Sequence, residues 1–101
     1  MTTLFRVISI QGNSALLLFY YGCTHSFISY SMVRKLNVKP RIFSPPLIVN
    51  TPSGEKTLVD KQVGPILLDV QGKSIVSEFA MYHLVGIDII LGMDWCNDPK
   101  S

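Results

Sequence analysis

The chain has 101 residues, a length that fits one small domain with a limited hydrophobic core. Its formal net charge of +2 gives no basis for nucleic-acid binding, although Arg34, Lys35, Lys39 and Arg41 form a local basic cluster. No uninterrupted apolar run reaches the about 18 residues that a membrane span requires, so neither a nucleic acid nor a membrane is an expected partner.

The composition points instead to a protein partner. Charged residues make up 16% of the chain, below the roughly 25% that is typical of soluble domains. A small domain with few charges and many branched apolar residues is expected to hide apolar surface against a partner. A homodimer is the simplest arrangement, because symmetric dimers are the commonest oligomers.

The cysteine content bears on the cellular compartment. The two cysteines, Cys23 and Cys96, do not form a disulfide framework, and the N-terminus does not resemble a secretory signal. The sequence therefore predicts an intracellular protein with reduced thiols, in the cytoplasm or, as an open alternative, the nucleus.

The first 20 residues predict a β-hairpin. Leu4–Ile10 alternates between apolar and polar residues, as a strand with one buried face does. Gln11-Gly12-Asn13-Ser14 is a turn signal, because Gly and Asn tolerate a positive φ. Ala15–Phe19 is an apolar run that predicts a buried strand leading into a turn at Gly22.

A short helix is predicted next. Ser29 is a good N-cap for a helix that runs to Leu36. Asn37 can end this helix, and Pro40 prevents its continuation. One face at helical spacing collects the apolar residues Ile28, Met32, Val33 and Leu36.

The remainder of the chain predicts strands and turns. Extended segments are expected at Leu47–Asn50, Thr57–Val63, Ile66–Val70, Ser74–Tyr82 and Val85–Leu91. Turns or breaks between these segments are expected at Pro45-Pro46, Pro52-Ser53-Gly54, Gly64-Pro65 and Gln71-Gly72-Lys73. Gly92 is expected to begin a C-terminal turn or helix that contains Trp95. Many short strands with one or two short helices predict a mainly β fold, a small closed β-barrel, as a single domain over residues 1–101.

Three motifs occur in order along this chain. The first is Tyr20-Tyr21-Gly22-Cys23-Thr24, which follows an apolar strand and continues as His25-Ser26-Phe27-Ile28-Ser29. The second is Thr51-Pro52-Ser53-Gly54-Glu55, and the third is Leu91-Gly92-Met93-Asp94-Trp95. Together they resemble the retropepsin-like aspartic protease domain of plant gypsy-type LTR retrotransposon polyproteins, over nearly the whole chain.

The resemblance implies a retropepsin-type barrel with named parts. A flap that closes over substrate is implied at about residues 48–60, and its substrate-binding residues would be Asn50, Thr51, Pro52, Ser53 and Gly54. A second family motif is implied in a C-terminal turn or helix at about residues 91–98, with Leu91, Gly92, Asp94 and Trp95. The resemblance also implies a homodimer, because each subunit of the family supplies only one of two catalytic carboxylates.

Aspartic proteolysis uses one carboxylate as a general base on water and a second, protonated one to polarise the scissile carbonyl. The family has Asp-Ser-Gly or Asp-Thr-Gly where this chain has Tyr20-Tyr21-Gly22. Gly22 and Thr24 match the family, and Cys23 replaces the usual Ala. A tyrosine hydroxyl, with an unperturbed pKa of about 10, is a poor base at neutral pH. We therefore predict no catalytic residue in this loop and no aspartic protease activity.

No other acid is expected to substitute for the missing one. None of the seven acidic residues follows an apolar strand and precedes a Gly turn as Tyr20 does. For Asp88 and Asp94 the resemblance implies structural roles near the C-terminal helix. The complete set is Glu55, Asp60, Asp69, Glu78, Asp88, Asp94 and Asp98.

Two further chemistries are disfavoured. Cys23 and His25 could share one face of an extended segment, but no third residue orients the imidazole, and a free Cys often behaves as a small hydrophobe. A zinc site from Cys23, His25, His83 and Cys96 lacks the paired spacing of structural zinc modules. No metal and no cofactor are expected.

Three functions remain open. The favoured one is a catalytically inactive retropepsin-like domain that dimerises and binds a peptide or protein. The first alternative is an aspartic endopeptidase of a retrotransposon polyprotein, seen here as an inactivated variant. The second is a host interaction module that uses Tyr20 and Tyr21 as a contact surface, since Tyr is favoured at interfaces.

Overall fold

A computed structural model of the chain describes residues 4–20, 25–50, 54, 56–70 and 72–92. These residues form seven strands and one helix. In chain order the elements are β1 (Leu4–Ile10), β2 (Asn13–Tyr20), β3 (Phe27–Ser29), α1 (Tyr30–Leu36), β4 (Arg41–Asn50), β5 (Lys56–Val70), β6 (Lys73–Tyr82) and β7 (Ile89–Gly92). The predicted mainly β fold with a short helix is confirmed.

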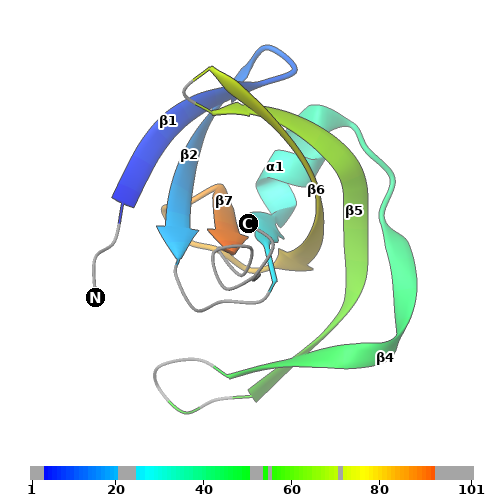
Figure 1. Cartoon of the computed structure of the whole chain (residues 1–101). Helices are drawn as coiled ribbons and strands as arrows, with labels where there is room; N and C mark the ends of the chain where they lie inside the picture. Colours follow the sequence, from blue (N-terminus) through cyan, green and yellow to red (C-terminus); the bar gives the residue numbers. More distant parts are fainter. Residues whose placement is uncertain (1–3, 21–24, 51–53, 55, 71, 93–101) are drawn as a thin grey trace, which may run out of the picture.

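All of these strands belong to one sheet with the order β1-β2-β7-β3-β6-β5-β4. The pairs β2–β7 and β3–β6 are parallel, and the other neighbours are antiparallel. One further residue pair, Ser9 with Asp69, joins β1 back to β5, so the sheet curls around its core (Figure 1). The sequence predicted a closed barrel; in the structure, the link between β1 and β5 consists of this single residue pair. Strand β4 pairs only with β5 and lies at the edge of the described sheet.

The hairpin of β1 and β2 has a tighter turn than the sequence predicted. Gln11 and Gly12 have φ angles of 50° and 80°, and two successive positive values are what a two-residue type I′ hairpin turn requires. Ile10 pairs with Asn13. Asn13 and Ser14 therefore begin β2 and are not part of the turn.

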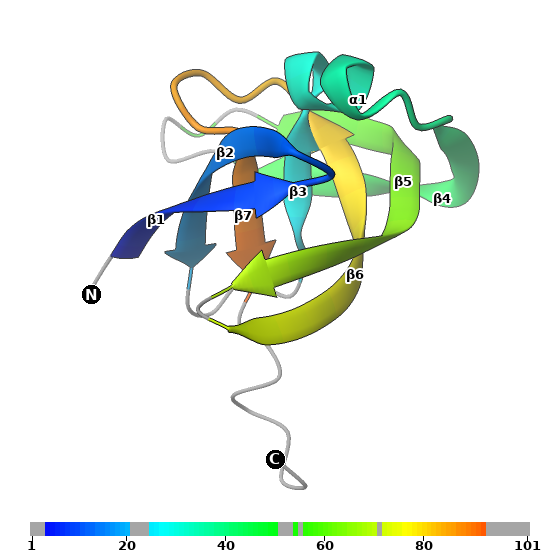
Figure 2. The ribbon, with the colours of Figure 1, turned by 90° about the horizontal axis from the view of Figure 1, so that it is seen from above.

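Helix α1 begins and ends where the sequence predicted. The Ser29 hydroxyl accepts a hydrogen bond from the Met32 N–H at 3.1 Å, which satisfies a free donor of the first turn. Asn37 adopts φ 56°, and its N–H donates to the Val33 carbonyl at 3.0 Å. Met32, Val33 and Leu36 are buried, and the helix covers one end of the curled sheet (Figure 2).

The sequence predicted that Pro45-Pro46 and Gly64-Pro65 would interrupt strands, but β4 and β5 continue through them. Gly64-Pro65 lies inside β5, a continuous strand of 15 residues, and only the pairing register with β6 shifts between Val63 and Ile66. Pro45-Pro46 likewise lies inside β4, at a register shift between Ile42 and Leu47. Pro is tolerated there because β4 is an edge strand and its outer N–H groups have no ladder partner to lose.

The last strand is shorter than predicted. Only Ile89–Gly92 forms β7, whereas the predicted strand began at Val85. Val85 is 80% exposed, and Gly86 adopts φ 78°, so this stretch is a loop despite its apolar residues. The sequence analysis also missed β3, which has three residues and is too short to show an alternating pattern.

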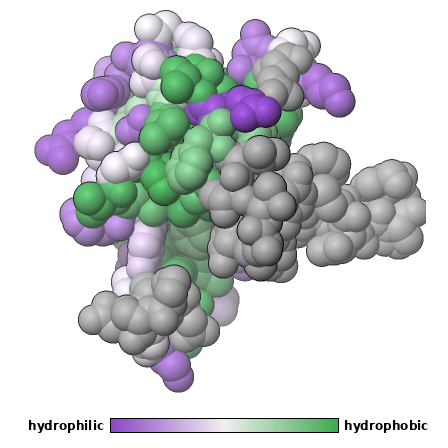
Figure 3. All heavy atoms as spheres, turned by 90° about the vertical axis from the view of Figure 1, so that its left-hand side faces the viewer, coloured by the Kyte–Doolittle hydropathy of each residue, from purple (hydrophilic) through white to green (hydrophobic). Residues whose placement is uncertain are grey.

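The two faces of the sheet differ in burial. On the inner face, Leu17, Ile89 and Ile28 pair across three adjacent strands and are fully buried. On the outer face of the β1–β2 hairpin, Phe5 and Val7 are 49% and 72% exposed. Apolar side chains gather on the side of the molecule shown in Figure 3. The hairpin thus has one face in the core and one apolar face open to solvent.

Candidate functional site

The first and third sequence motifs meet at one end of two parallel strands. Tyr20, the last residue of β2, pairs with Gly92, the last residue of β7. Parallel strands end at the same edge of a sheet, so these two predicted site residues lie side by side. The side chain of Tyr20 and the residues Tyr21, Gly22, Cys23 and Thr24 lie outside the described residues.

A serine fixes the segment that follows this loop. The Ser26 hydroxyl accepts a hydrogen bond from the Gly92 N–H at 3.1 Å. The Ser26 carbonyl accepts another from the Ala80 N–H at 2.9 Å. One residue therefore joins the exit of the loop to the end of β7 and to β6.

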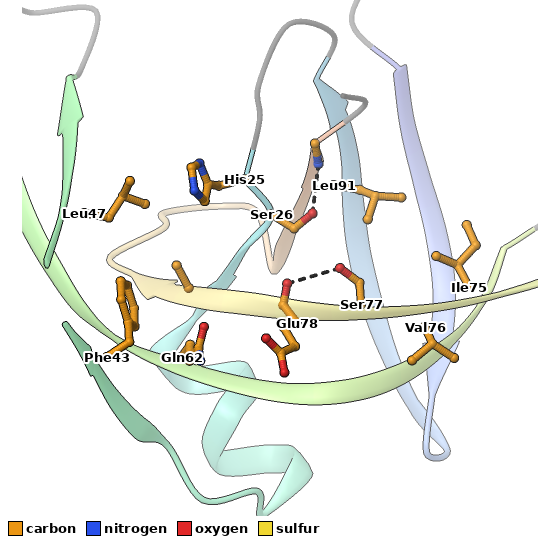
Figure 4. Close-up of a pocket in the computed structure, with 12 residues that line it drawn as sticks. His25, Ser26, Phe43, Leu47, Gln62, Ile75, Val76, Ser77, Glu78 and Leu91 are labelled. Atoms are coloured by element: carbon orange, nitrogen blue, oxygen red, sulfur yellow. Dashed lines mark hydrogen bonds between the residues drawn. The ribbon is translucent and has the colours of Figure 1, made fainter. Parts of the chain in front are cut away.

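A groove of about 450 Å³ opens beside this junction (Figure 4). Ser26, Leu91 and Gly92 line the end that lies nearest to Tyr20. We call this hollow the peptide groove, after the ligand proposed for it below. Its remaining lining residues, contributed mainly by β4, β5 and β6, are His25, Phe43, Leu47, Gln62, Ile75, Val76, Ser77, Glu78 and Ala80.

The hairpin of β4 and β5 borders the groove and spans the residues predicted to form a flap. Asn50 pairs with Lys56, and Ile48 pairs with Leu58. Leu47 faces the groove (Figure 4), whereas the neighbouring Ile48 is 57% exposed. Of the predicted flap residues, Gly54 is exposed with φ 90°, and the side chain of Asn50 and all of Thr51, Pro52 and Ser53 lie outside the described residues. Substrate binding by this flap stays a prediction.

The groove carries one carboxylate from the described part of the chain, that of Glu78. Its Oε2 atom lies 3.0 Å from a guanidinium nitrogen of Arg41, and both side chains are about half exposed. Arg41 also donates to the Gly64 carbonyl at 3.2 Å. The negative charge of the groove is therefore compensated.

The other described acids lie away from Tyr20. Asp88 precedes β7, and its carboxylate accepts the Leu16 N–H at 2.8 Å. The backbone of Asp88 also donates to the Leu16 carbonyl and accepts from the Ser29 N–H. Asp60 and Asp69 are exposed on β5. Asp88 is thus engaged with backbone at the opposite end of β7, and Glu55, Asp94 and Asp98 lie outside the described residues.

The predicted C-terminal motif is only partly described. Leu91 and Gly92 belong to β7, where Leu91 is buried and Gly92 pairs with Tyr20. Leu91 lies at the end of a strand as the predicted segment Val85–Leu91 had it, whereas Gly92, which was predicted to start a turn or helix, is the last residue of β7. Asp94 and Trp95 lie beyond the described residues, so the turn or helix implied at about residues 91–98 is excluded for Leu91 and Gly92 and stays a prediction for the residues after them.

Metal and membrane features can be assessed only for the described ranges. Within them, His, Cys, Asp and Glu side chains form no group of three or more that could hold a metal ion. Cys23 and Cys96, which the weighed zinc site requires, lie outside those ranges. Among the residues that the structure describes, no helix is long and apolar enough to cross a bilayer.

Solved structures with a similar fold are retroviral-type proteases. EIAV protease in complex with the inhibitor HBY-793 gives a TM-score of 0.67 at 16% identity, covering 99% of this chain and 90% of the protease. The retroviral protease-like domain of Ddi1 from Leishmania major gives 0.65 at 15% identity, covering 99% of this chain and 79% of that domain. The chain thus has a retropepsin-like fold.

The family follows from the sequence. The profile of the family described as retroviral aspartyl protease matches residues 2–101. The chain belongs to the retroviral aspartyl protease family. No curated protein matches it in sequence.

Proposed function

We propose that this chain is a catalytically silent retropepsin-like domain of a plant gypsy-type retrotransposon polyprotein. It forms a homodimer inside the cell and binds extended peptide segments in the peptide groove, without a metal or cofactor. The active endopeptidase and the tyrosine contact surface are the two alternatives that the experiments below separate from it.

The observation that carries the proposal is the residue at the end of β2. The resemblance implies that the family presents its carboxylate from this position, and the chain has Tyr20 there, paired with Gly92. A neutral phenol does not deprotonate water at neutral pH. Among the described acids, Glu78 is bound to Arg41 and Asp88 to backbone, which supports the absence of a replacement base.

Exposed apolar surface supports self-association. Phe5 and Val7, two residues apart on β1, are 49% and 72% exposed. Contiguous apolar surface on a small domain commonly marks an interaction site. Burial of this surface in a second copy would remove it from water without any change in fold.

Peptide binding is supported by the form of the groove. Phe43 and Leu47 of β4 and Ile75 of β6 supply apolar walls. One side of β4 is not paired to another strand of the described sheet. An extended peptide binds such an edge through backbone hydrogen bonds, and pockets select alternate side chains. Neither interaction requires a catalytic acid.

Two measurements on the unmodified chain test the proposal. Sedimentation is expected to give a particle of two chains, and a strictly monomeric particle at high concentration would exclude the dimer. In NMR titration with an extended apolar peptide, shifts are expected at Ser26, Phe43, Leu47 and Gln62. Shifts confined to other surfaces would exclude the groove.

A matched pair of variants sharpens the second measurement. Leu47→Gln places an amide in the groove wall and is expected to weaken peptide binding about tenfold, since roughly 1.4 kcal/mol of apolar contact is lost. Ile48→Gln changes the next residue, on the exposed flap face, and is expected to leave affinity within about twofold. Equal effects of the two substitutions would contradict binding in the groove.

A further inference from the structure

Charge is divided unevenly along this chain. The segment from Met1 to Gly54 contains no acidic residue, and all seven acidic residues follow it. Four of the nine basic residues fall in one short stretch of the acid-free segment: Arg34, Lys35, Lys39 and Arg41. The net charge of +2 conceals this separation.

In the part of the chain that the structure describes, three of these four cations lack an acidic partner. Arg41 is bound to Glu78 at 3.0 Å. Across the residues that the structure describes, no ion pair joins Arg34, Lys35 or Lys39 to a carboxylate. All three side chains are exposed at the end of α1 and in the turn after it.

The same region contains an apolar hollow of about 480 Å³, which we call the helix groove. Val33, Val38, Pro40 and Met81 line it with aliphatic surface. Tyr30 and Arg34 also line it, and Tyr30 is 47% exposed, so its ring is open to a ligand. Apolar walls beside uncompensated positive charge suit a ligand that carries both an apolar and an acidic group.

The helix groove is separate from the peptide groove. Ala80 lines the peptide groove and Met81 lines the helix groove. These residues are neighbours in β6, and successive side chains of a strand point to opposite faces of the sheet. A ligand in one groove therefore does not occupy the other.

We infer that the helix groove is a docking site for an acidic segment of a partner protein that carries an apolar anchor residue. The aliphatic side chains would receive the anchor, and Arg34, Lys35 and Lys39 would face carboxylates that flank it. Charge complementarity of this kind speeds association and selects the partner. A nucleic acid fits less well, because the walls are apolar and only three uncompensated cations are available to phosphates.

The probe is a short synthetic peptide with a Leu-Phe pair flanked on both sides by Glu residues, added to the full chain at low salt. Amide and methyl shifts are expected at Tyr30, Arg34, Val38 and Met81, with no shifts at Phe43 in the peptide groove. Binding should weaken steeply as salt rises, since exposed charges are screened. Absence of binding, or shifts located at the peptide groove, would overturn the inference.

Three comparison ligands identify what is recognised. A peptide with Lys in place of Glu, and one with Ser-Ser in place of Leu-Phe, are each expected to bind at least about fivefold more weakly. A thymidine oligonucleotide of equal charge is expected to bind more weakly than the acidic peptide. Equal or tighter binding of the oligonucleotide would overturn the choice of a protein partner.

Charge reversal tests the named cations. Arg34→Glu is expected to weaken the acidic peptide about fivefold or more. Lys73→Glu, a matched reversal at the far end of β6 from Met81, is expected to change affinity by less than about twofold. Equal losses in the two variants would show a general charge effect and would contradict a site at α1.

Discussion

The hydroxyl of Ser26 joins two segments that are 66 residues apart in sequence. It accepts the N–H of Gly92, which in turn pairs with Tyr20. The ends of β2 and β7 are therefore linked to the segment before β3 through a polar contact that involves no acidic side chain.

Removal of this contact is expected to destabilise the fold. Ser26→Ala leaves the partly buried Gly92 N–H without a partner and should lower the free energy of unfolding by about 1–2 kcal/mol. Ser26→Thr keeps a hydroxyl and should recover most of the loss. Urea unfolding at fixed protein concentration measures both.

Ser77→Ala is the control, because the Ser77 hydroxyl bonds to the exposed carbonyl of its neighbour Glu78. It should cost no more than about 0.5 kcal/mol. A cost for Ser26→Ala as small as that of the control would contradict the role assigned to Ser26.

Among the elements, β5 shows how a strand can bend without ending. At Gly64 the backbone adopts φ 126°, and a Cβ built there would lie 3.0 Å from the Glu78 Cα and from the Ser77 carbonyl oxygen. Only glycine allows both the backbone angle and this close approach to β6. The bend lets β5 pair with β6 along both of its halves and also form a hairpin with β4.

Gly64→Ala is therefore expected to destabilise the protein by about 2–3 kcal/mol, because it combines backbone strain with a clash against backbone atoms. Gly72→Ala is the matched control. Its φ is also positive, at 81°, but nothing lies within 4 Å of its built Cβ, so strain alone should cost about 1 kcal/mol. Thermal unfolding of the two variants compares them, and equal losses would argue against a close approach at Gly64.

Elements were predictable where their signals are local. Helix α1 was predicted at both ends because Ser29 and Asn37 act on backbone groups a few residues away. Gly64-Pro65 was misread, because whether it bends or ends a strand depends on pairing with Ser77 and Phe79 of β6, which lie more than ten residues further along the chain. Apolar Val85 was misread for the same reason, since nothing local shows that it is exposed.

The same limit applies to the candidate site. The loop at Tyr20 and the Leu91-Gly92 motif were recognisable as short motifs, and their meeting follows from the β2–β7 pairing. The groove walls were not predicted. Phe43, Gln62 and Ile75 come from three strands that only the folded sheet brings together.

At the scale of the whole molecule, successive side chains of a strand alternate between the buried core and the exposed surface. On β5, Leu68 is fully buried and the adjacent Leu67 is 60% exposed. Leu68 belongs to the main core cluster with residues of β1, β2 and β7, so it helps hold the curled sheet together. The single β1–β5 residue pair contributes far less contact than this shared core.

Leu68→Ala is expected to lower the free energy of unfolding by about 3 kcal/mol, since it leaves a cavity in the core. Leu67→Ala makes the same chemical change one residue earlier and should stay within about 0.5 kcal/mol. Chemical denaturation at equal protein concentrations measures the difference. Similar losses in both variants would contradict the assigned orientation of β5.

The most direct measurement is cleavage of an extended apolar peptide at mildly acidic pH, by the unmodified chain and by its Tyr20→Asp/Tyr21→Ser variant. The unmodified chain should show no pepstatin-sensitive cleavage, because the end of β2 offers no carboxylate to activate water. The double variant restores the acid of the family and should cleave. Cleavage by the unmodified chain that is lost when one of its own residues is changed would contradict a silent domain.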